Sequence, residues 1–145
     1  MMRMKKVMFQ KVLLPVDLSN RHGQALKIGC SLALLNRGEL ILLHVIELIS
    51  GLSMREEKAF YEKLEKAAQS HLRKLAKKGS AKVSVRQRII FGRRGPSIIK
   101  FAKQMGTDLI VLTAPKVDFK NPSPGWGSLS YKISILARCP VLLVK

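Results

Sequence analysis

Short apolar runs alternate with longer amphipathic segments along the whole chain, and this alternation constrains the fold more than any other feature. The apolar runs are rich in Val, Ile and Leu and cover residues 9–16, 40–46, 82–91, 108–113 and 140–144. Segments with apolar residues at helical spacing lie between them, at residues 20–36, 55–78, 96–105 and 128–138. Strands that alternate with helices predict a doubly wound α/β fold with a parallel sheet and right-handed crossovers.

The composition of the runs predicts where each strand lies in the sheet. Residues 40–46 are almost continuously apolar, as expected for a central strand covered on both faces. Residues 82–91 alternate apolar and charged side chains, which suits an edge strand. We expect the switch point of the sheet, where ligands bind in such folds, between the strands at 9–16 and 108–113. A length of 145 residues with 47% hydrophobic content suits one domain over residues 1–145.

The helical segments carry local signals for their ends and their buried faces. Leu18-Ser19-Asn20 predicts an N-cap for a first helix over residues 20–36, and Pro96 suits the first position of the third. Gly106 is expected to end that third helix. The predicted buried stripes are Ala25, Ile28, Gly29, Leu32 and Leu35; Phe60, Leu64, Ala67, Ala68, Leu72 and Leu75; Ile98, Phe101, Ala102 and Met105; and Leu129, Ile133, Leu136 and Ala137.

The chain is strongly basic, with 27 Lys and Arg against 9 Asp and Glu and a formal net charge of +18. Such a surface attracts polyanions. The basic residues are spread along the whole chain, and no zinc-finger, RRM or KH signature accompanies them. A solvated basic surface is therefore favoured over a dedicated nucleic-acid site, which stays open as an alternative. No apolar segment approaches the roughly 18 residues of a membrane span, so we expect no membrane contact and a cytoplasmic location.

Signals for metal binding or catalysis are weak. Cys30 and Cys139 lie far apart, and the three histidines show no paired ligand spacing, so no metal is predicted. No GxxxxGK[ST] loop or GxSxG elbow is present. We therefore predict that the protein is not an enzyme and assign no catalytic residue. Asp17, His44 and Ser128 are the candidates if it were one, by proximity alone.

Polar and small residues follow the strands that should meet at the switch point. Pro15 and Asp17 end the first strand, His44 and Val45 the second, and the segment from Thr113 to Leu129 follows the fourth. Backbone N–H groups of Gly127, Ser128 and Leu129 would open a helix, where the helix dipole favours a phosphate. Asp17 could accept from a ribose hydroxyl or an adenine amine. The alternative is that these residues only cap helices and turn the chain.

The order of these segments resembles the universal stress protein family over nearly the whole chain. The similar segments are Lys11–Asp17, Leu42–Glu47, Gly95-Pro96, Asp108–Leu112 and Gly127-Ser128 through Val144. The resemblance implies a Rossmann-like fold with a five-stranded parallel sheet of order 3-2-1-4-5 and helices on both faces. It also implies a cytoplasmic binding and signalling module in the stress response, dimeric through the C-terminal strand Val141–Val144. Some members of the family bind ATP and others do not.

The resemblance carries some nucleotide-binding positions to this chain and leaves one motif unmatched. Asp17, Val45, Gly127 and Ser128 match the family's adenosine and phosphate positions, whereas the segment Thr113–Lys116 replaces the Gly-x-x-Gly turn. A proline in that turn fixes φ and removes a donor, so ATP or another nucleotide is expected to bind weakly or in an altered mode. Side-chain charge could compensate, from Lys116, Lys120, Arg93 and Arg94. Residues 121–126 are expected to form a stiff lid or a loop. The alternatives are a scaffold without nucleotide and a basic polyanion-binding protein.

Overall fold

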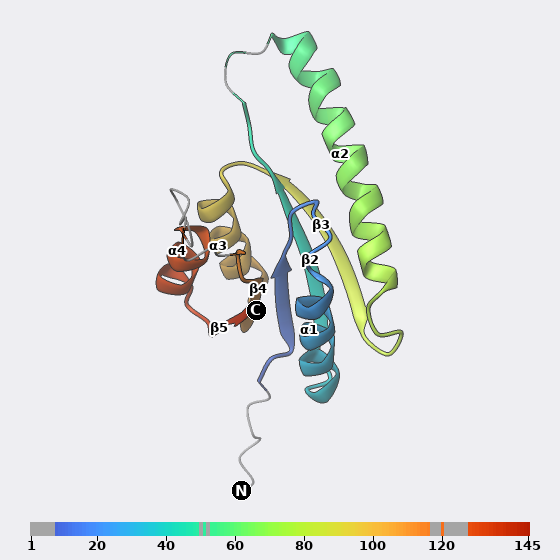
Figure 1. Cartoon of the computed structure of the whole chain (residues 1–145), viewed down its shortest axis with the longest axis vertical. Coiled ribbons are helices and arrows are strands. Elements are labelled where there is room, and N and C mark those ends of the chain that lie inside the picture. Colours follow the sequence, from blue (N-terminus) through green and yellow to red (C-terminus); the bar gives the residue numbers. More distant parts are fainter. Residues whose placement is uncertain (1–7, 50, 52, 117–119, 121–127) are drawn as a thin grey trace, which may run out of the picture.

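The computed structural model describes residues 8–49, 51, 53–116, 120 and 128–145. Strands and helices alternate along the chain as the sequence predicts (Figure 1). In chain order they are β1 (Lys11–Pro15), α1 (Gly23–Leu35), β2 (Glu39–Ile46), α2 (Met54–Lys77), β3 (Ser84–Phe91), α3 (Arg94–Met105), β4 (Leu109–Thr113), α4 (Ser128–Leu136) and β5 (Val141–Val144).

The five strands form one parallel sheet in the order β3-β2-β1-β4-β5, which confirms the predicted fold class. Val12 of β1 is in register with Leu40 of β2 on one side and with Leu109 of β4 on the other. The chain therefore winds outward from β1 in both directions. The carboxyl ends of β1 and β4 define the switch point at which a ligand is expected in this class of fold.

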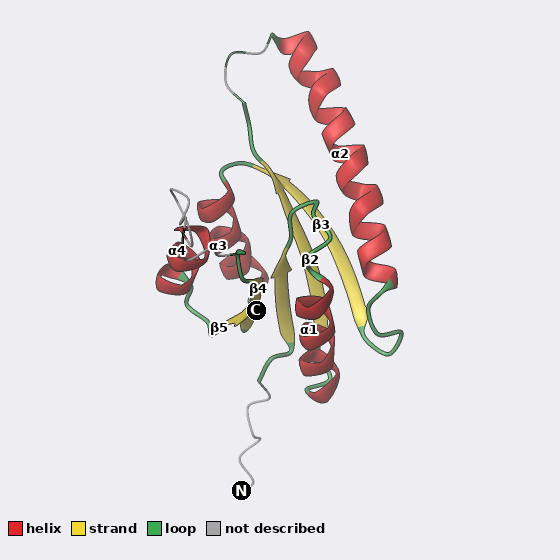
Figure 2. Cartoon of the chain, in the orientation of Figure 1, coloured by secondary structure: helices red, strands yellow, loops and turns green. Residues whose placement is uncertain are grey.

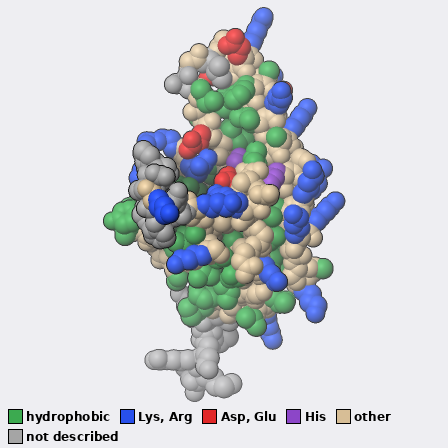
Figure 3. All heavy atoms as spheres, viewed as in Figure 1, with side chains coloured by type: hydrophobic (Ala, Val, Ile, Leu, Met, Phe, Trp, Pro, Cys, Tyr) green, Lys and Arg blue, Asp and Glu red, His purple; other side chains and the backbone are tan. Residues whose placement is uncertain are grey.

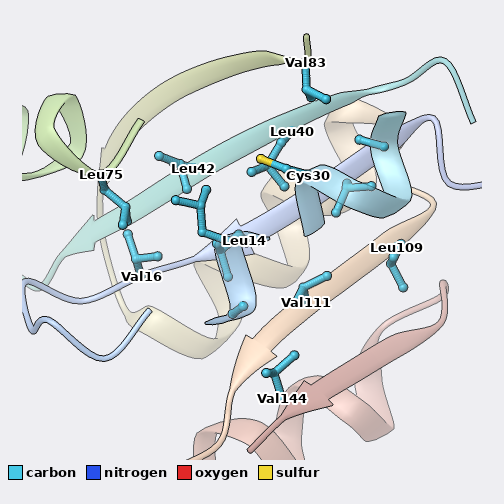
Figure 4. Packing of buried hydrophobic residues seen from close by; sticks show 14 of the residues in the cluster. Leu14, Val16, Cys30, Leu40, Leu42, Leu75, Val83, Leu109, Val111 and Val144 are labelled. Carbon is cyan, nitrogen blue, oxygen red and sulfur yellow. The ribbon is translucent and has the colours of Figure 1, made fainter. Parts of the chain in front are cut away.

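The helices cover both faces of the sheet (Figure 2). Alternate residues of the central strands enter two separate core clusters, because successive side chains of a strand point to opposite faces. Leu14 and Leu42 pack with Cys30 of α1 and Leu72 of α2 on one face (Figure 4). On the other face, Leu13 and Ile41 pack with residues of α3 and α4 such as Ile98 and Ile133.

Helix α1 begins later than the sequence predicts, and the face it buries includes the predicted Ala25 and Gly29 but is rotated away from Leu35. It starts at Gly23, and His22 rather than Asn20 precedes it, with no side-chain cap. The buried residues are Ala25, Leu26, Gly29, Cys30 and Ala33, whereas Leu35 is 79% exposed. Small residues lie against the sheet here, so the backbone of α1 approaches it closely. The larger Ile28 and Leu32 lie only half buried at the edge of the contact.

Helix α2 confirms the predicted range but only half of its predicted stripe. Its N-terminal half projects past the ends of the strands (Figure 1), and Phe60 in that half is exposed. Ala67, in the second half, is exposed as well. Ala68, Leu72 and Leu75 are buried on the sheet. A capping box starts the helix: the Ser53 hydroxyl accepts from the Glu56 N–H, and the Glu56 carboxylate accepts from the Ser53 N–H, both at 3.2 Å.

Two smaller predictions about α3 and α4 are corrected. Pro96 is the third residue of α3 rather than the first, because the helix already begins at Arg94. Leu136 at the end of α4 is 60% exposed, whereas Ile133 is fully buried as predicted. Gly106 does end α3, with the left-handed φ of 67° that glycine adopts without strain. In the described part of the chain, no helix is both long and apolar enough to cross a membrane.

Candidate functional site

The structure brings four predicted site residues to the carboxyl edge of the sheet, around the switch point. Pro15 ends β1 and is buried, and Asp17 follows it with a side chain that is 41% exposed. Thr113 ends β4, next to β1. Val45 of β2 is 5% exposed and packs in the core cluster on the side of α3. Asp17 and Thr113 are thus the polar groups of this set that reach the edge.

His22 joins Asp17 to Thr113 across the switch point. Its ring is almost fully buried, with 5% of the residue exposed. Nε2 of His22 lies 2.7 Å from Oδ1 of Asp17, and Nδ1 lies 2.7 Å from Oγ1 of Thr113. The Thr113 hydroxyl can donate or accept, so it serves either imidazole tautomer. One buried imidazole therefore ties the end of β1 to the end of β4.

The Asp17 carboxyl is held in its ionised form. Partial burial acts to raise its pKa, but hydrogen bonds from Ser19 and His22 together outweigh burial and hold the pKa of Asp17 well below its ordinary value. Oδ1 accepts from the Ser19 N–H at 2.9 Å, and the nearest cation to Oδ2 is Arg21 Nη2 at 3.7 Å. Oδ1 is therefore occupied by the protein, whereas Oδ2 faces a looser contact and remains an acceptor for an incoming N–H or O–H group.

Residues 114–116, which directly follow β4, offer few backbone donors, which agrees with the unmatched glycine motif. The Ala114 N–H donates to the Val144 carbonyl at 2.7 Å, so it extends the pairing of β4 with β5. Pro115 has no N–H. Lys116 follows with an exposed side chain. At the described residues 114–116, a phosphate would therefore meet the Lys116 side chain rather than free N–H groups of Ala114 or Pro115.

The N-termini of α3 and α4 lie close together at the same edge. A Cβ atom on Gly95, in the first turn of α3, would lie 3.7 Å from Cδ1 of Leu129 in α4. Arg93 precedes α3, and the Arg94 N–H donates to Glu47 at 3.3 Å. Two helix N-termini at one edge add their positive dipole ends there. The predicted Gly127 and the lid at 121–126 lie outside the described residues, as does the side chain of Ser128, the first residue of α4.

The other candidates for chemistry do not assemble into a catalytic set among the residues described. His44 uses Nδ1 on the Val16 carbonyl at 2.8 Å, so its ring anchors the chain after β1. Cys30 is buried and Cys139 half-buried, and burial raises the pKa of the Cys139 thiol. No group of three or more His, Cys, Asp or Glu side chains suited to a metal ion occurs in the described part of the chain.

A cavity of about 240 Å³ lies at the opposite, amino end of β4 and β5. Residues from the end of α3, the end of α4 and the turns that precede the two strands line it. Among these, Thr107 has a buried hydroxyl without a hydrogen-bond partner. The cavity contains none of the predicted site residues, so it is separate from the edge that carries Asp17.

His22 is the residue of this edge that sequence reasoning passed over. His22 lacks the spacing to a second ligand that is typical of a metal-binding histidine. Its partners are Asp17, five residues before it, and Thr113, 91 residues after it. Thr113 lies beside it only because β4 pairs with β1 in the sheet. The position five residues after a strand-end Asp, at the start of a helix, was the one available signal.

These features define a doubly wound α/β protein with an ionised carboxylate, a buried histidine and two helix N-termini at its switch point. A model of the Universal stress protein family matches residues 8–145, and the chain belongs to that family. The resemblance found in the sequence is therefore confirmed.

Individual relatives agree with this assignment. Universal stress protein YxiE of Bacillus subtilis (strain 168) is 30% identical over 149 residues, covering 95% of this chain and 100% of the relative. The structure of universal stress protein UspA from Lactobacillus plantarum superposes with a TM-score of 0.74 at 21% identity, covering 97% of this chain and 100% of that one. A universal stress protein family protein from Arabidopsis thaliana with AMP bound gives a TM-score of 0.67 at 19% identity, with 94% and 91% covered.

Proposed function

We propose that this protein is a nucleotide-binding module of the stress response that binds its ligand at the carboxyl edge of β1 and β4. The observation that carries the proposal is the Asp17 carboxylate, which is held ionised at the switch point with one oxygen in only a loose contact. Such an oxygen accepts a hydrogen bond from an adenine amine or a ribose hydroxyl. The AMP bound by the Arabidopsis relative supports a nucleotide as the ligand class.

We further propose that side chains, rather than a backbone turn, hold the phosphates. Neither Ala114 nor Pro115 has a free backbone N–H directly after β4. Lys116 and Arg93 are exposed cations at the same edge, and the helix N-termini add partial positive charge. Flexible cations discriminate less between one and three phosphates than a fixed cradle does. ATP should therefore bind this protein no more than about tenfold more tightly than AMP.

Titration calorimetry with adenosine, AMP and ATP tests the proposal. In Asp17→Asn, the side chain keeps its shape but loses the charge and gains a donor, so all three ligands should bind at least about tenfold more weakly, a loss of about 1.4 kcal/mol. Glu62→Gln on the exposed part of α2 makes the same charge change away from the edge and should leave the affinities unchanged.

Lys116→Gln distinguishes the phosphate contact from the adenosine contact. It should weaken AMP and ATP but not adenosine, because only the phosphate contact is lost. Lys132→Gln on the exposed surface of α4 is the matched control. If none of the three ligands produces heat with the wild-type protein, the nucleotide proposal is wrong and a scaffold role without nucleotide takes its place.

The same proposal includes no turnover, a cytoplasmic location and a homodimer. The candidates Asp17 and His44 are both engaged in contacts that position the chain, which supports binding rather than catalysis. Leu142 and Leu143 of β5 are 37% and 42% exposed at an edge of the sheet. An apolar edge strand is normally covered, which supports pairing of β5 with a second copy of the chain.

A further inference from the structure

The basic residues are spread along the whole chain, but the acidic residues are concentrated in parts of it. No Asp or Glu occurs between Lys66 and Thr107, a stretch that holds twelve of the 27 Lys and Arg residues. In the structure this stretch forms the second half of α2, the edge strand β3 and helix α3. The helices of this acid-free stretch lie on opposite faces of the sheet, with α2 on one face and α3 on the other, so only the α2 part is considered as one surface.

Part of that stretch lies along α2 and the turn that follows it, and we call this surface the basic ridge. It consists of exposed cations on the second half of α2 and the turn that follows it: Lys66, Arg73, Lys74, Lys77, Lys78 and Lys82. Figure 3 shows Lys and Arg side chains projecting along the margin formed by α2, with acidic side chains only near its upper end and toward the middle of the face. Arg86 and Arg88 are not included, because they alternate with Val85 and Ile89 and project from the other face of the sheet.

The spacing of the ridge residues places them on one side of the helix. Arg73 and Lys77 are four residues apart, as are Lys74 and Lys78, so each pair lies on the same face. Leu72 and Leu75 point the opposite way and are buried on the sheet. The helix runs about 16 Å from Lys66 to Lys77, which corresponds to about five base pairs of a nucleic-acid duplex.

The ridge cations are not used to stabilise the fold through ion pairs. Within the described part of the chain, Asp17 pairs with Arg21 and His22, and Glu39 pairs with Arg86. None of these ion pairs includes a ridge residue. Lys74 and Lys77 lie in the last turn of α2, where their positive charges interact favourably with the negative end of the helix dipole. That effect falls off within one turn, so it does not account for Lys66 or Arg73, nor for Lys82 beyond the helix.

The chemistry around the ridge selects among polyanions. Membrane-surface helices insert large apolar side chains, and no large exposed hydrophobic residue lies between Phe60 and Phe91 in the described chain. Single-stranded nucleic acid is held by stacking on aromatic side chains, and the ridge carries none. A duplex requires only a row of cations along its phosphate backbone.

We infer that the basic ridge is a binding surface for the phosphate backbone of a nucleic-acid duplex, independent of base sequence and separate from the proposed nucleotide site. The shared chemistry of DNA and RNA duplexes is a regular line of phosphates. Binding at the ridge releases counterions from that line, so the affinity falls steeply as salt increases. Duplex binding at the ridge does not depend on nucleotide binding at the carboxyl edge.

Fluorescence anisotropy with short DNA and RNA duplexes, over a range of salt concentrations, tests the inference. Four ridge cations are changed together, as Arg73→Gln, Lys74→Gln, Lys77→Gln and Lys78→Gln, because Gln favours helix about as well as Lys. The slope of log affinity against log salt should become shallower by about 2 to 4, since each phosphate contact contributes about 0.9. The affinity at about 50 mM salt should fall at least tenfold.

A control variant removes the same charge elsewhere on the surface. Lys58→Gln, Lys100→Gln, Lys103→Gln and Lys132→Gln change four exposed lysines outside the ridge. This variant should keep most of the salt slope and lose less than about threefold in affinity. Urea denaturation of both variants checks that each is folded before binding is compared.

The comparison has outcomes that overturn the inference. Equal losses in the ridge and control variants would show that only the overall net charge attracts the duplex. A wild-type affinity for duplex that does not change with salt would exclude backbone recognition. Ridge-dependent binding to vesicles of phosphatidylcholine and phosphatidylserine, with none to duplex, would assign the surface to a membrane instead. A preference between the DNA and RNA arms, if both are ridge-dependent, identifies which duplex fits better.

Discussion

Nδ1 of His22 lies 2.7 Å from Oγ1 of Thr113, although 91 residues separate the two in the chain. The contact crosses the switch point from the start of α1 to the end of β4. Because Nε2 of the same ring meets Asp17, the orientation of the Asp17 carboxylate depends on a residue of a different strand. The proposed binding edge and the stability of the central strands are therefore coupled through one buried imidazole.

A double-mutant cycle measures this coupling. His22→Ala leaves two polar partners without their hydrogen bonds and should lower the free energy of unfolding by about 1 to 3 kcal/mol. Thr113→Val removes one hydrogen bond at similar volume and should cost about 0.5 to 1.5 kcal/mol. The double variant should lose less than the sum of the two, because the shared contact is lost only once. Urea denaturation provides all four values.

Thr107→Val is the matched control for this cycle. The Thr107 hydroxyl is buried without a hydrogen-bond partner, so its replacement by a methyl group should leave stability unchanged or raise it. If the two threonine variants lose the same stability, or if the losses from His22→Ala and Thr113→Val simply add, the hydrogen bond across the switch point contributes nothing.

The low pKa of Asp17 predicts how its contribution to stability depends on pH. A carboxyl whose pKa is lower in the folded than in the unfolded protein stabilises the fold fully above its unfolded value, about 3.9, and loses that contribution as pH falls toward the folded value. Wild type should therefore be more stable than Asp17→Asn at pH 7, and the difference should shrink below about pH 4. Urea midpoints of both proteins at pH 7, 4 and 2.5 measure it. A difference that stays constant over this range would contradict the assigned pKa direction.

Two glycines near α1 should respond oppositely to alanine. A Cβ at Gly38 would lie 2.5 Å from the backbone of Gln10, which cannot move aside easily, so Gly38→Ala should cost about 1 to 3 kcal/mol. At Gly23, the first residue of α1, a Cβ meets nothing within 4 Å. Gly23→Ala should therefore stabilise the protein by up to about 1 kcal/mol through helix propensity. Thermal unfolding of both variants provides the comparison, and a Gly38→Ala protein as stable as wild type would disprove the close approach.

The proposed dimer predicts the effect of a charge on the edge strand. Leu142→Lys places an ammonium group on the apolar edge of β5 and should convert a dimer to a monomer, since a charged edge resists pairing. Leu35→Lys on α1 is the control, because Leu35 is more exposed, at 79%, and lies away from that edge. Sedimentation velocity distinguishes the two species. A wild-type protein that sediments as a monomer, or dissociation by both variants, would refute pairing through β5.

Local patterns predicted the elements well because each pattern reports a backbone preference. The apolar runs predicted the location of all five strands, and the alternating run at 82–91 predicted that β3 is an edge strand. Gly106 ends α3 as expected. Errors arose where tertiary contacts outweighed local signals. Ser19 and Asn20 are good caps, yet α1 begins at Gly23, because the side chain of Asp17 holds the preceding residues in a turn with Ser19. The stripe of α2 fails at Phe60 because the sheet does not extend that far.

The sequence by itself determined the fold class, the family and the position of Asp17 at the end of a strand, since these follow from periodicity and from residue types at fixed spacing. It also showed that the turn after β4 lacks glycine. Only the tertiary structure decided that His22 connects Asp17 to Thr113. That contact depends on which segments the parallel crossovers bring together, and no local pattern encodes the distance between residues so far apart in the chain.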